Sequence, residues 1–241
     1  MTTLMLDRYL FFALLLAIFI TPLVVSLSDR FRFPRFWPGL FPGIALMLLP
    51  MIPWDVWFTA KSIWGYNDDH VFGLYLVNVP IEKWLYFIAL PYICAYFYEA
   101  LNHFLPRSPL KPAQRFITSL LILGSFLLCA LFFDRLYTFS VFSLLCLLLL
   151  WHLLINQSEY IGQYFLAFLF HLVPFLALNG AFNGTFSGNP MMWHAKSEIL
   201  GYYILSFPVE DIAYSMIITL LAITIMEEMK IRRPTGVLTV G

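Results

Sequence analysis

Long apolar runs dominate this chain, and short polar connections separate them. Seven stretches of 16 or more mostly apolar residues recur, and a bilayer core about 30 Å thick takes about 20 residues of helix. The pattern predicts an all-α membrane protein with seven transmembrane helices, at 9–27, 40–57, 81–101, 116–133, 139–154, 160–178 and 209–226. Pro42, Pro50 and Pro53 fall in the second run and are expected to interrupt its outer end.

Composition agrees with lipid as the solvent. Hydrophobic residues make up 61% of the chain and charged residues 12%, which is about half the charge that a soluble domain carries on its surface. The net charge is zero and no basic run occurs, which excludes nucleic-acid binding. The three cysteines have no metal-ligand or disulfide spacing, so we expect no metal.

The distribution of lysine and arginine predicts the orientation in the membrane. Short cytoplasmic loops carry an excess of these residues. With seven spans, nine of the fourteen fall on one side, which places the N-terminus outside and the C-terminus inside a cell membrane, expected to be the bacterial inner membrane. These nine are Arg30, Arg32, Arg35, Arg107, Lys111, Arg115, Lys230, Arg232 and Arg233.

An internal repeat relates the two halves of the chain. A shift of 128 residues superposes six identities in the 27 positions from 73 to 99, among them Pro80 on Pro208 and Glu82 on Glu210. We therefore predict a three-helix repeat over residues 1–105, a linker helix over 106–136, a second three-helix repeat over 137–230 and a cytoplasmic tail over 231–241. A single linking helix makes the two repeats parallel.

The repeated phrase, Pro-x-Glu, heads the third and seventh predicted helices at their outer ends. One interpretation is structural, because proline suits the first helical position and glutamate complements the positive end of the helix dipole. The functional interpretation is that a carboxyl group kept at the membrane in both repeats does chemistry, since such groups are costly there. Tyr86 and Tyr214 follow Glu82 and Glu210 by four residues, on the same helix faces.

Four stretches resemble one family. They are PWDVWFTAKSIWGYN at 53–67, VPIEKWLYF at 79–87, YFYEALN at 96–102 and FPVEDIAYS at 207–215. Together they are similar to the small, integral-membrane, cofactor-independent lycopene cyclases in their fused, single-chain form. The resemblance covers nearly all of residues 9–228. The chain departs from the family at Lys83, where the family tends to carry a second acidic residue.

The resemblance implies a redox-neutral intramolecular lyase or isomerase reaction that closes the ends of lycopene into rings, giving beta- or gamma-carotene, without a cofactor. Glu82 or Glu210 is the expected acid, and Asp55 or Asp211 the expected base or polarising group. An acid that protonates an alkene must be neutral and dry, and aromatic faces stabilise a carbocation. The expected substrate-binding residues are Trp54, Trp57, Trp64, Trp84, Tyr86 and Tyr214, which could equally form an interfacial aromatic belt, and His171, an intramembrane histidine that could instead bond a neighbouring helix.

Other functions are weighed against this one. The chain has no G-x-G-x-x-G, no paired Asp-rich motif, and no lysine in the seventh helix for a retinal Schiff base. A small membrane transporter or a carotenoid- or lipid-binding protein without catalysis is the open alternative. The expected partners are lipid and a long apolar polyene from the bilayer, and the sequence leaves open an association with other enzymes of carotenoid synthesis or with a second copy.

Overall fold

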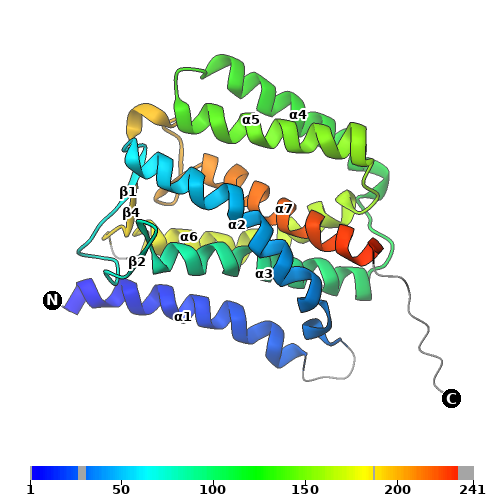
Figure 1. The fold of residues 1–241 in the computed structure, drawn as a ribbon, viewed down its shortest axis with the longest axis horizontal. Helices are drawn as coiled ribbons and strands as arrows, with labels where there is room; N and C mark the ends of the chain where they lie inside the picture. The colour runs from blue at the N-terminus through cyan, green and yellow to red at the C-terminus, as the bar shows by residue number, and fades with distance from the viewer. Residues whose placement is uncertain (1, 27–30, 187, 233–241) are drawn as a thin grey trace.

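The structure, a computed structural model, describes residues 2–26, 31–186 and 188–232. This part of the chain is mostly helical and contains seven α-helices (Figure 1), as the apolar pattern predicts. They are α1 (Thr2–Val25), α2 (Trp37–Ala60), α3 (Ile81–Phe104), α4 (Gln114–Leu131), α5 (Leu136–Leu150), α6 (Ile161–Phe182) and α7 (Glu210–Arg232). The predicted tail lies outside the described residues, except for residues 231 and 232, which end α7.

Six of the seven helices are long and apolar enough to cross a membrane. The exception is α1, whose described apolar part is Tyr9–Val25. Seventeen residues of α-helix span about 25 Å, which is less than the hydrocarbon core. The seventh span, the orientation and the division into parallel repeats therefore stay predictions.

The helices pack in layers around α7 (Figure 1). This helix is the most buried of the six candidate spans, and it packs against α2, α3 and α5. Two pairs, α3 with α6 and α4 with α5, complete the bundle, and α1 covers α3 and α6 on one side. The outermost helix is α4, the predicted linker, because little of its surface is buried by the rest of the chain. The centre of the protein is thus next to α7.

One expectation about α2 is wrong. Pro42, Pro50 and Pro53 do not interrupt the helix, which runs without a break from Trp37 to Ala60. Prolines are tolerated inside membrane helices because neighbouring helices and local adjustments satisfy the backbone groups that they free. The neighbour here is α7, against which α2 makes its most extensive contact. As a result Asp55, the expected base or polarising group, lies within a helix and is fully buried.

The contact between α2 and α7 depends on a glycine. A Cβ added at Gly43 would meet the backbone oxygen of Ala222 at 2.7 Å, whereas a Cβ at Gly124 in α4 would meet nothing within 4 Å. We expect Gly43→Ala to lower the free energy of unfolding by about 1–3 kcal/mol, since the helices must separate. Gly124→Ala is the control and should cost nothing, because alanine favours helix. Unfolding in mixed micelles measures both, and equal stability of the two variants would contradict the prediction.

The two long connections before α3 and α7 form an ordered cap at one end of the bundle. Strand β1 (Trp64–Tyr66) from the first connection pairs antiparallel with β4 (Met192–His194) from the second. Two short hairpins follow, one made of β2 (Tyr75–Leu76) and β3 (Val79–Pro80), the other of β5 (Tyr203–Ile204) and β6 (Phe207–Pro208). The hairpins have the same register when shifted by 128 residues, so the repeated sequence forms the same local structure twice.

Four short helices complete the chain. They are η1 (Phe33–Phe36), η2 (Lys111–Ala113), η4 (Lys196–Glu198) and the π-helix η3 (Trp151–Asn156), which prolongs α5. Each connects longer elements, and η2 and η3 lie at the end of the bundle opposite the cap, where α3 and α5 end.

Candidate functional site

The two motif glutamates have matching environments. Glu82 Oε1 accepts a hydrogen bond from the backbone N–H of Phe72 at 2.5 Å, and Glu210 Oε1 accepts one from Leu200 N–H at 2.6 Å. Both donors lie ten residues before their glutamate, in the loop that leads into each hairpin. The second oxygen, Oε2, is buried in both cases and has no hydrogen-bond partner among the described residues. Each glutamate therefore anchors a cap loop with one oxygen and keeps the other unpartnered.

The residues that directly follow the glutamates, Lys83 and Asp211, point in a different direction from the glutamate side chains. Neighbouring positions on a helix are about 100° apart, so residue i+1 faces a different direction from residue i. Lys83 and Asp211, which the repeat places at equivalent positions, are both buried and both face the middle of the cap end. Their side chains interact electrostatically with each other. The two motifs thus contribute one cation and one carboxylate to the same place.

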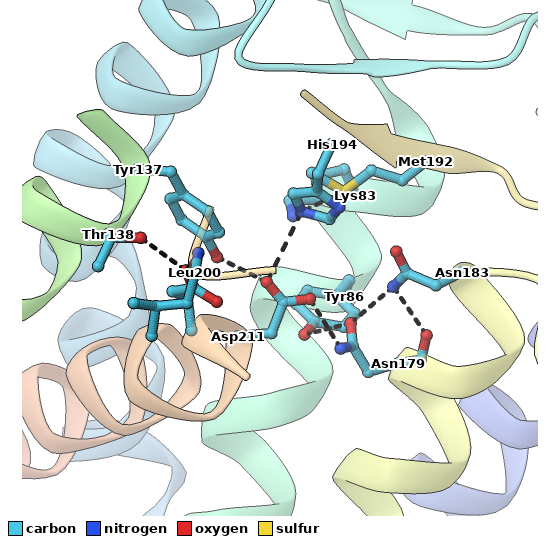
Figure 2. Close-up of polar contacts among 11 residues, drawn as sticks. Lys83, Tyr86, Tyr137, Thr138, Asn179, Asn183, Met192, His194, Leu200 and Asp211 are labelled. Carbon is cyan, nitrogen blue, oxygen red and sulfur yellow. Dashed lines mark hydrogen bonds and ion pairs between the residues drawn. The ribbon is translucent and has the colours of Figure 1, made fainter. Parts of the chain in front are cut away.

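Asp211 is the hub of a hydrogen-bonded group (Figure 2). Its Oδ1 accepts from Tyr137 Oη at 2.6 Å and lies 3.6 Å from His194 Nε2, and its Oδ2 accepts from Asn179 Nδ2 at 2.9 Å. Tyr86 donates to Asn179 Oδ1 at 3.1 Å. We call the following residues the central polar cluster: Asp55, Tyr66, Lys83, Tyr86, Tyr137, Asn179, His194 and Asp211.

Glu210 adjoins this cluster through α5. Thr138 Oγ1 donates to Glu210 Oε1 at 2.6 Å, and the preceding residue, Tyr137, donates to Asp211. Two successive residues at the start of α5 thus bond two successive carboxylates at the start of α7. No such link to the cluster is seen for Glu82 among the described residues. The two glutamates therefore have similar local environments, but Glu210 adjoins the hydrogen bonds of the cluster and Glu82 does not.

Lys83 lies in an aromatic cage. Its Nζ is 5.0 to 5.7 Å from five ring centroids, and the hydrogen-bond contact recorded for Nζ is Met192 Sδ at 3.7 Å. Asp55 and Asp211 are the carboxylates that interact electrostatically with it. A cation here is held by aromatic faces and by opposite charge. The rings belong to Trp64, Tyr86, Phe87, Phe182 and Tyr214.

Asp55 reaches the cluster from α2. Its Oδ2 accepts from Tyr66 Oη at 2.7 Å, and its Oδ1 is buried without a hydrogen-bond partner. Burial first, and then the nearby Asp55 carboxylate, raise the pKa of Tyr66 well above its ordinary value. Tyr66 therefore keeps its proton and acts as a donor that fixes one oxygen of Asp55.

His194 lies in β4 and Tyr66 lies in β1. The two residues occupy equivalent positions when the chain is shifted by 128 residues. Its side chain is only 5% exposed, and its ring stacks on that of Tyr137 with centroids 5.6 Å apart. Burial lowers the pKa of His194, Asp211 opposes this effect, and Lys83 adds to it. The imidazole is therefore neutral near pH 7.

A pH dependence of stability follows from this lowered pKa. As the pH falls below about 6.5, the unfolded chain takes up a proton at His194 before the folded chain does, so stability falls by at most about 1.4 kcal/mol per pH unit until the lower folded pKa is reached. We expect His194→Gln to reduce this acid loss between about pH 7 and about pH 5. Unfolding in mixed micelles across this range measures it. His103→Gln, at an exposed histidine, is the control, and equal acid loss in both variants would contradict the prediction.

An apolar recess of about 390 Å³ opens beside the cluster. It lies between α2 and α5 and is lined by Pro53, Trp54, Trp57, Phe58, Ser140 and Leu144. Two of these residues connect it to the cluster: Trp54 packs edge-on against Tyr214 at 5.4 Å, and Phe58 lies 4.8 Å from Trp64 between ring centroids. The buried Tyr214 hydroxyl has no hydrogen-bond partner. A long apolar molecule in the recess would contact the aromatic side of the cluster.

Three of the residues expected to bind substrate do not join the aromatic group behind the recess. Trp84 donates to Leu76 O in the first hairpin at 3.1 Å, away from the recess. Trp57 lines the recess but is 47% exposed. His171 is buried between α6 and α7, where its Nε2 lies 3.0 Å from Ser215 Oγ. The structure brings Trp54, Trp64, Tyr86 and Tyr214 together, leaves Trp57 at the exposed rim of the recess, and places Trp84 against the first hairpin and His171 against α7.

The sequence did not predict the roles of four residues in the cluster: Tyr66, Tyr137, Asn179 and His194. The repeat held a signal for one pair, because Tyr66 and His194 occupy equivalent positions. Asn179 and Tyr137 gave no such signal, since each lies at a helix end where polar residues are common. Within the described residues, no group of three or more His, Cys, Asp or Glu side chains is placed to hold a metal ion.

Comparisons with known proteins bear on this geometry. Residues 8–101 and 134–229 match the sequence model of a family described as Lycopene cyclase. Among curated proteins, a bifunctional lycopene cyclase/phytoene synthase of Podospora anserina is 34% identical over 59 residues, which is 24% of this chain and 10% of that protein. Proteins of the same description match from Colletotrichum graminicola, with the same identity and coverage, and from Aspergillus niger, at 34% over 55 residues, 23% of this chain and 10% of that protein. The matches span about a tenth of each relative. No solved structure matches.

Proposed function

The chain belongs to the lycopene cyclase family, and we propose that it closes the acyclic ends of lycopene into ionone rings by a redox-neutral, acid-catalysed isomerisation. The observation that carries the proposal is the group of buried carboxylates beside an aromatic, apolar recess. Carboxyl groups provide the acid and base that such a reaction needs, and the recess fits the end of a long hydrocarbon.

The proposed reaction has three steps. A carboxylic acid gives its proton to the terminal double bond of lycopene and leaves a tertiary carbocation. The neighbouring double bond then attacks this cation, which forms the ring C–C bond and moves the positive charge into the ring. Loss of a ring proton to a carboxylate forms the new double bond. One proton enters and one leaves, so no electrons are gained or lost and no redox cofactor is required.

Glu210 is the proposed acid. Its buried, unpartnered Oε2 can carry the proton, while Oε1 is fixed by Leu200 N–H and Thr138 Oγ1. A fixed carboxyl group keeps its geometry as the proton leaves, which favours catalysis. Glu82 has the same anchored arrangement but no recorded link to the cluster, so we assign it to the cap loop and, as a second candidate, to the acid role.

The carbocation would form against aromatic faces. Trp54 separates the recess from the cluster, and Tyr214 and Trp64 lie directly behind it. Ring faces stabilise a cation and exclude water, which would otherwise capture the intermediate as an alcohol.

Asp55 and Asp211 are the proposed groups for the final step. Asp55 has an oxygen without a partner, next in sequence to Trp54, and suits the base. Asp211 accepts from Tyr137 and Asn179 and suits the polarising role, because its lone pairs are largely used. Lys83 interacts electrostatically with both carboxylates and so couples the two groups.

We also propose where the reaction takes place and which carotene it forms. The recess opens on the side of the helix bundle, so lycopene would enter from the bilayer of a cell membrane that the chain crosses several times. The expected product is beta-carotene if both ends react and gamma-carotene if one does.

Expression in a bacterial host that accumulates lycopene tests the function. We expect the pigment to shift from lycopene to cyclic carotene of the same mass, as chromatography with mass spectrometry resolves. An unchanged pigment that co-purifies with the folded protein would overturn the enzymatic proposal in favour of carotenoid binding or transport. A product of different mass would contradict the redox-neutral mechanism.

A further inference from the structure

A second cavity, of about 280 Å³, lies at the end of the bundle opposite the cap. It is formed where η2 leads into α4 and where η3 connects to α6. Its walls are polar, in contrast to the recess beside the cluster. The side chains that matter for the argument are Lys111, Gln114, Arg115, Thr118, Gln157 and Ser158.

The lining favours an anion. Lys111 and Arg115 bring two positive charges, and the amides and hydroxyls add neutral donors. The acidic residue in the lining is Glu159, which binds Lys111 Nζ at 3.1 Å on the exposed rim. His152, also in the lining, is engaged by Ser158 and Thr224 at 2.7 and 3.1 Å. The cavity therefore has an excess of positive charge and of hydrogen-bond donors.

The cavity is built on a rigid contact. A Cβ added at Gly162 would lie 2.9 Å from Gln114 Oε1 and 3.1 Å from the backbone of Lys111. Gly162 N–H donates to the same Gln114 oxygen at 3.2 Å. The start of α6 and the start of α4 are thus packed against each other without room for adjustment, which fixes the positions of the side chains around the cavity.

Two helix N-termini meet at this contact. The N-cap residues Ala113 and Tyr160 make no side-chain hydrogen bond to the first turns of α4 and α6, and Gln114 Oε1 accepts from Gly162 N–H in the first turn of α6. The positive end of a helix dipole attracts anions, particularly phosphate. The dipoles add to the charges of Lys111 and Arg115, so the helix ends and the side chains favour the same kind of ligand.

We propose that this cavity binds a phosphate group, specifically the headgroup of an anionic membrane lipid. The cavity lies at the polar end of α4, and the apolar side chains along that helix, including Phe116, Leu120 and Leu123, are exposed. A lipid with its phosphate at Arg115 would place its acyl chains along these residues. Basic pockets between membrane helices suit such headgroups. The inference does not depend on the proposed function.

Binding to the purified full chain in neutral detergent tests the site. The probes are dihexanoyl phosphatidylglycerol, dihexanoyl phosphatidylcholine and inorganic phosphate, with affinity measured by calorimetry. We expect the Lys111→Gln/Arg115→Gln double variant to bind phosphatidylglycerol at least about tenfold more weakly than the intact chain, since charge-assisted hydrogen bonds are lost. Arg107→Gln/Lys196→Gln is the matched control, because it removes the same charge from exposed residues that do not line the cavity.

Each outcome decides the proposal. Selective loss in the first variant, with phosphatidylglycerol preferred over phosphatidylcholine, supports it. Inorganic phosphate that fails to compete identifies the source as lipid, whereas equal binding of inorganic phosphate supports the phosphate site with a soluble source. Equal loss in the control variant, or no preference between the two lipids, overturns the proposal, because binding would then be diffuse or indifferent to charge.

Discussion

Glu210→Gln is expected to reduce ring formation by about 10² to 10⁴-fold, the usual effect of removing a general acid. Glutamine keeps an oxygen where Glu210 accepts from Leu200 N–H and Thr138 Oγ1, so the cap loop stays anchored. What is lost is the proton on the second oxygen, which is buried and has no partner. The measurement is the ratio of cyclic carotene to lycopene in the producing host, normalised to the amount of folded protein in the membrane.

Two further variants make this result specific. Glu198 also accepts a backbone N–H, from Leu136 at 2.9 Å, but is not buried. Glu198→Gln should therefore retain activity and serves as the control. Glu82→Gln should keep more activity than Glu210→Gln, because within the described part of the chain no hydrogen bond links Glu82 to the central polar cluster. Full activity in both Glu82→Gln and Glu210→Gln would exclude the motif glutamates as the acid and direct attention to Asp55.

Lys83→Met is expected to lower the free energy of unfolding by about 3–5 kcal/mol, the usual cost of removing one partner from a buried group of charges. Methionine fills a similar volume and suits an aromatic cage, so the main change is the loss of the positive charge. Asp55 and Asp211 would then be buried without the cation with which they interact. Unfolding in mixed micelles of increasing ionic detergent measures the change.

The matched control is Lys61→Met, which removes a lysine from the exposed cap surface and should change stability by less than about 1 kcal/mol. Adding Asp211→Asn to Lys83→Met should recover part of the lost stability, because one of the two uncompensated charges disappears. A Lys83→Met variant as stable as the intact chain would refute the view that this lysine balances the carboxylates. It would instead favour a neutral lysine held by its aromatic neighbours.

Much of the fold was predictable because apolar pattern and helix length are local properties. Six predicted spans correspond to helices that are long and apolar enough to cross a membrane, and the residues that match at a shift of 128 include those of two matching hairpins. The error at α2 has a physical cause. Three prolines weaken an isolated helix, but the packing of α7 against it, through Gly43 and Ala222, is a long-range contact that no local pattern contains.

The candidate site was predicted in part. The motifs identified Glu82, Glu210, Asp55 and Asp211, and the structure buries all four. The structure also gives neighbouring motif positions different roles, which the motif itself does not reveal. The two glutamates accept hydrogen bonds from cap loops, while the residues that follow them, Lys83 and Asp211, belong to the cluster. Tyr137 and Asn179 join Asp211 from α5 and α6, which are distant in sequence and carry no motif.

The sequence by itself determined the helices, their apolar character, the repeated Pro-x-Glu motif and the residue types that can do acid–base chemistry, because these depend on composition and on spacing along one helix. Only the tertiary structure decided which side chains meet. A lysine that looks like a departure from a carboxylate pair becomes the charge that two distant aspartates share. Electrostatic energy depends on distance and burial in three dimensions, and the order of residues along the chain specifies neither.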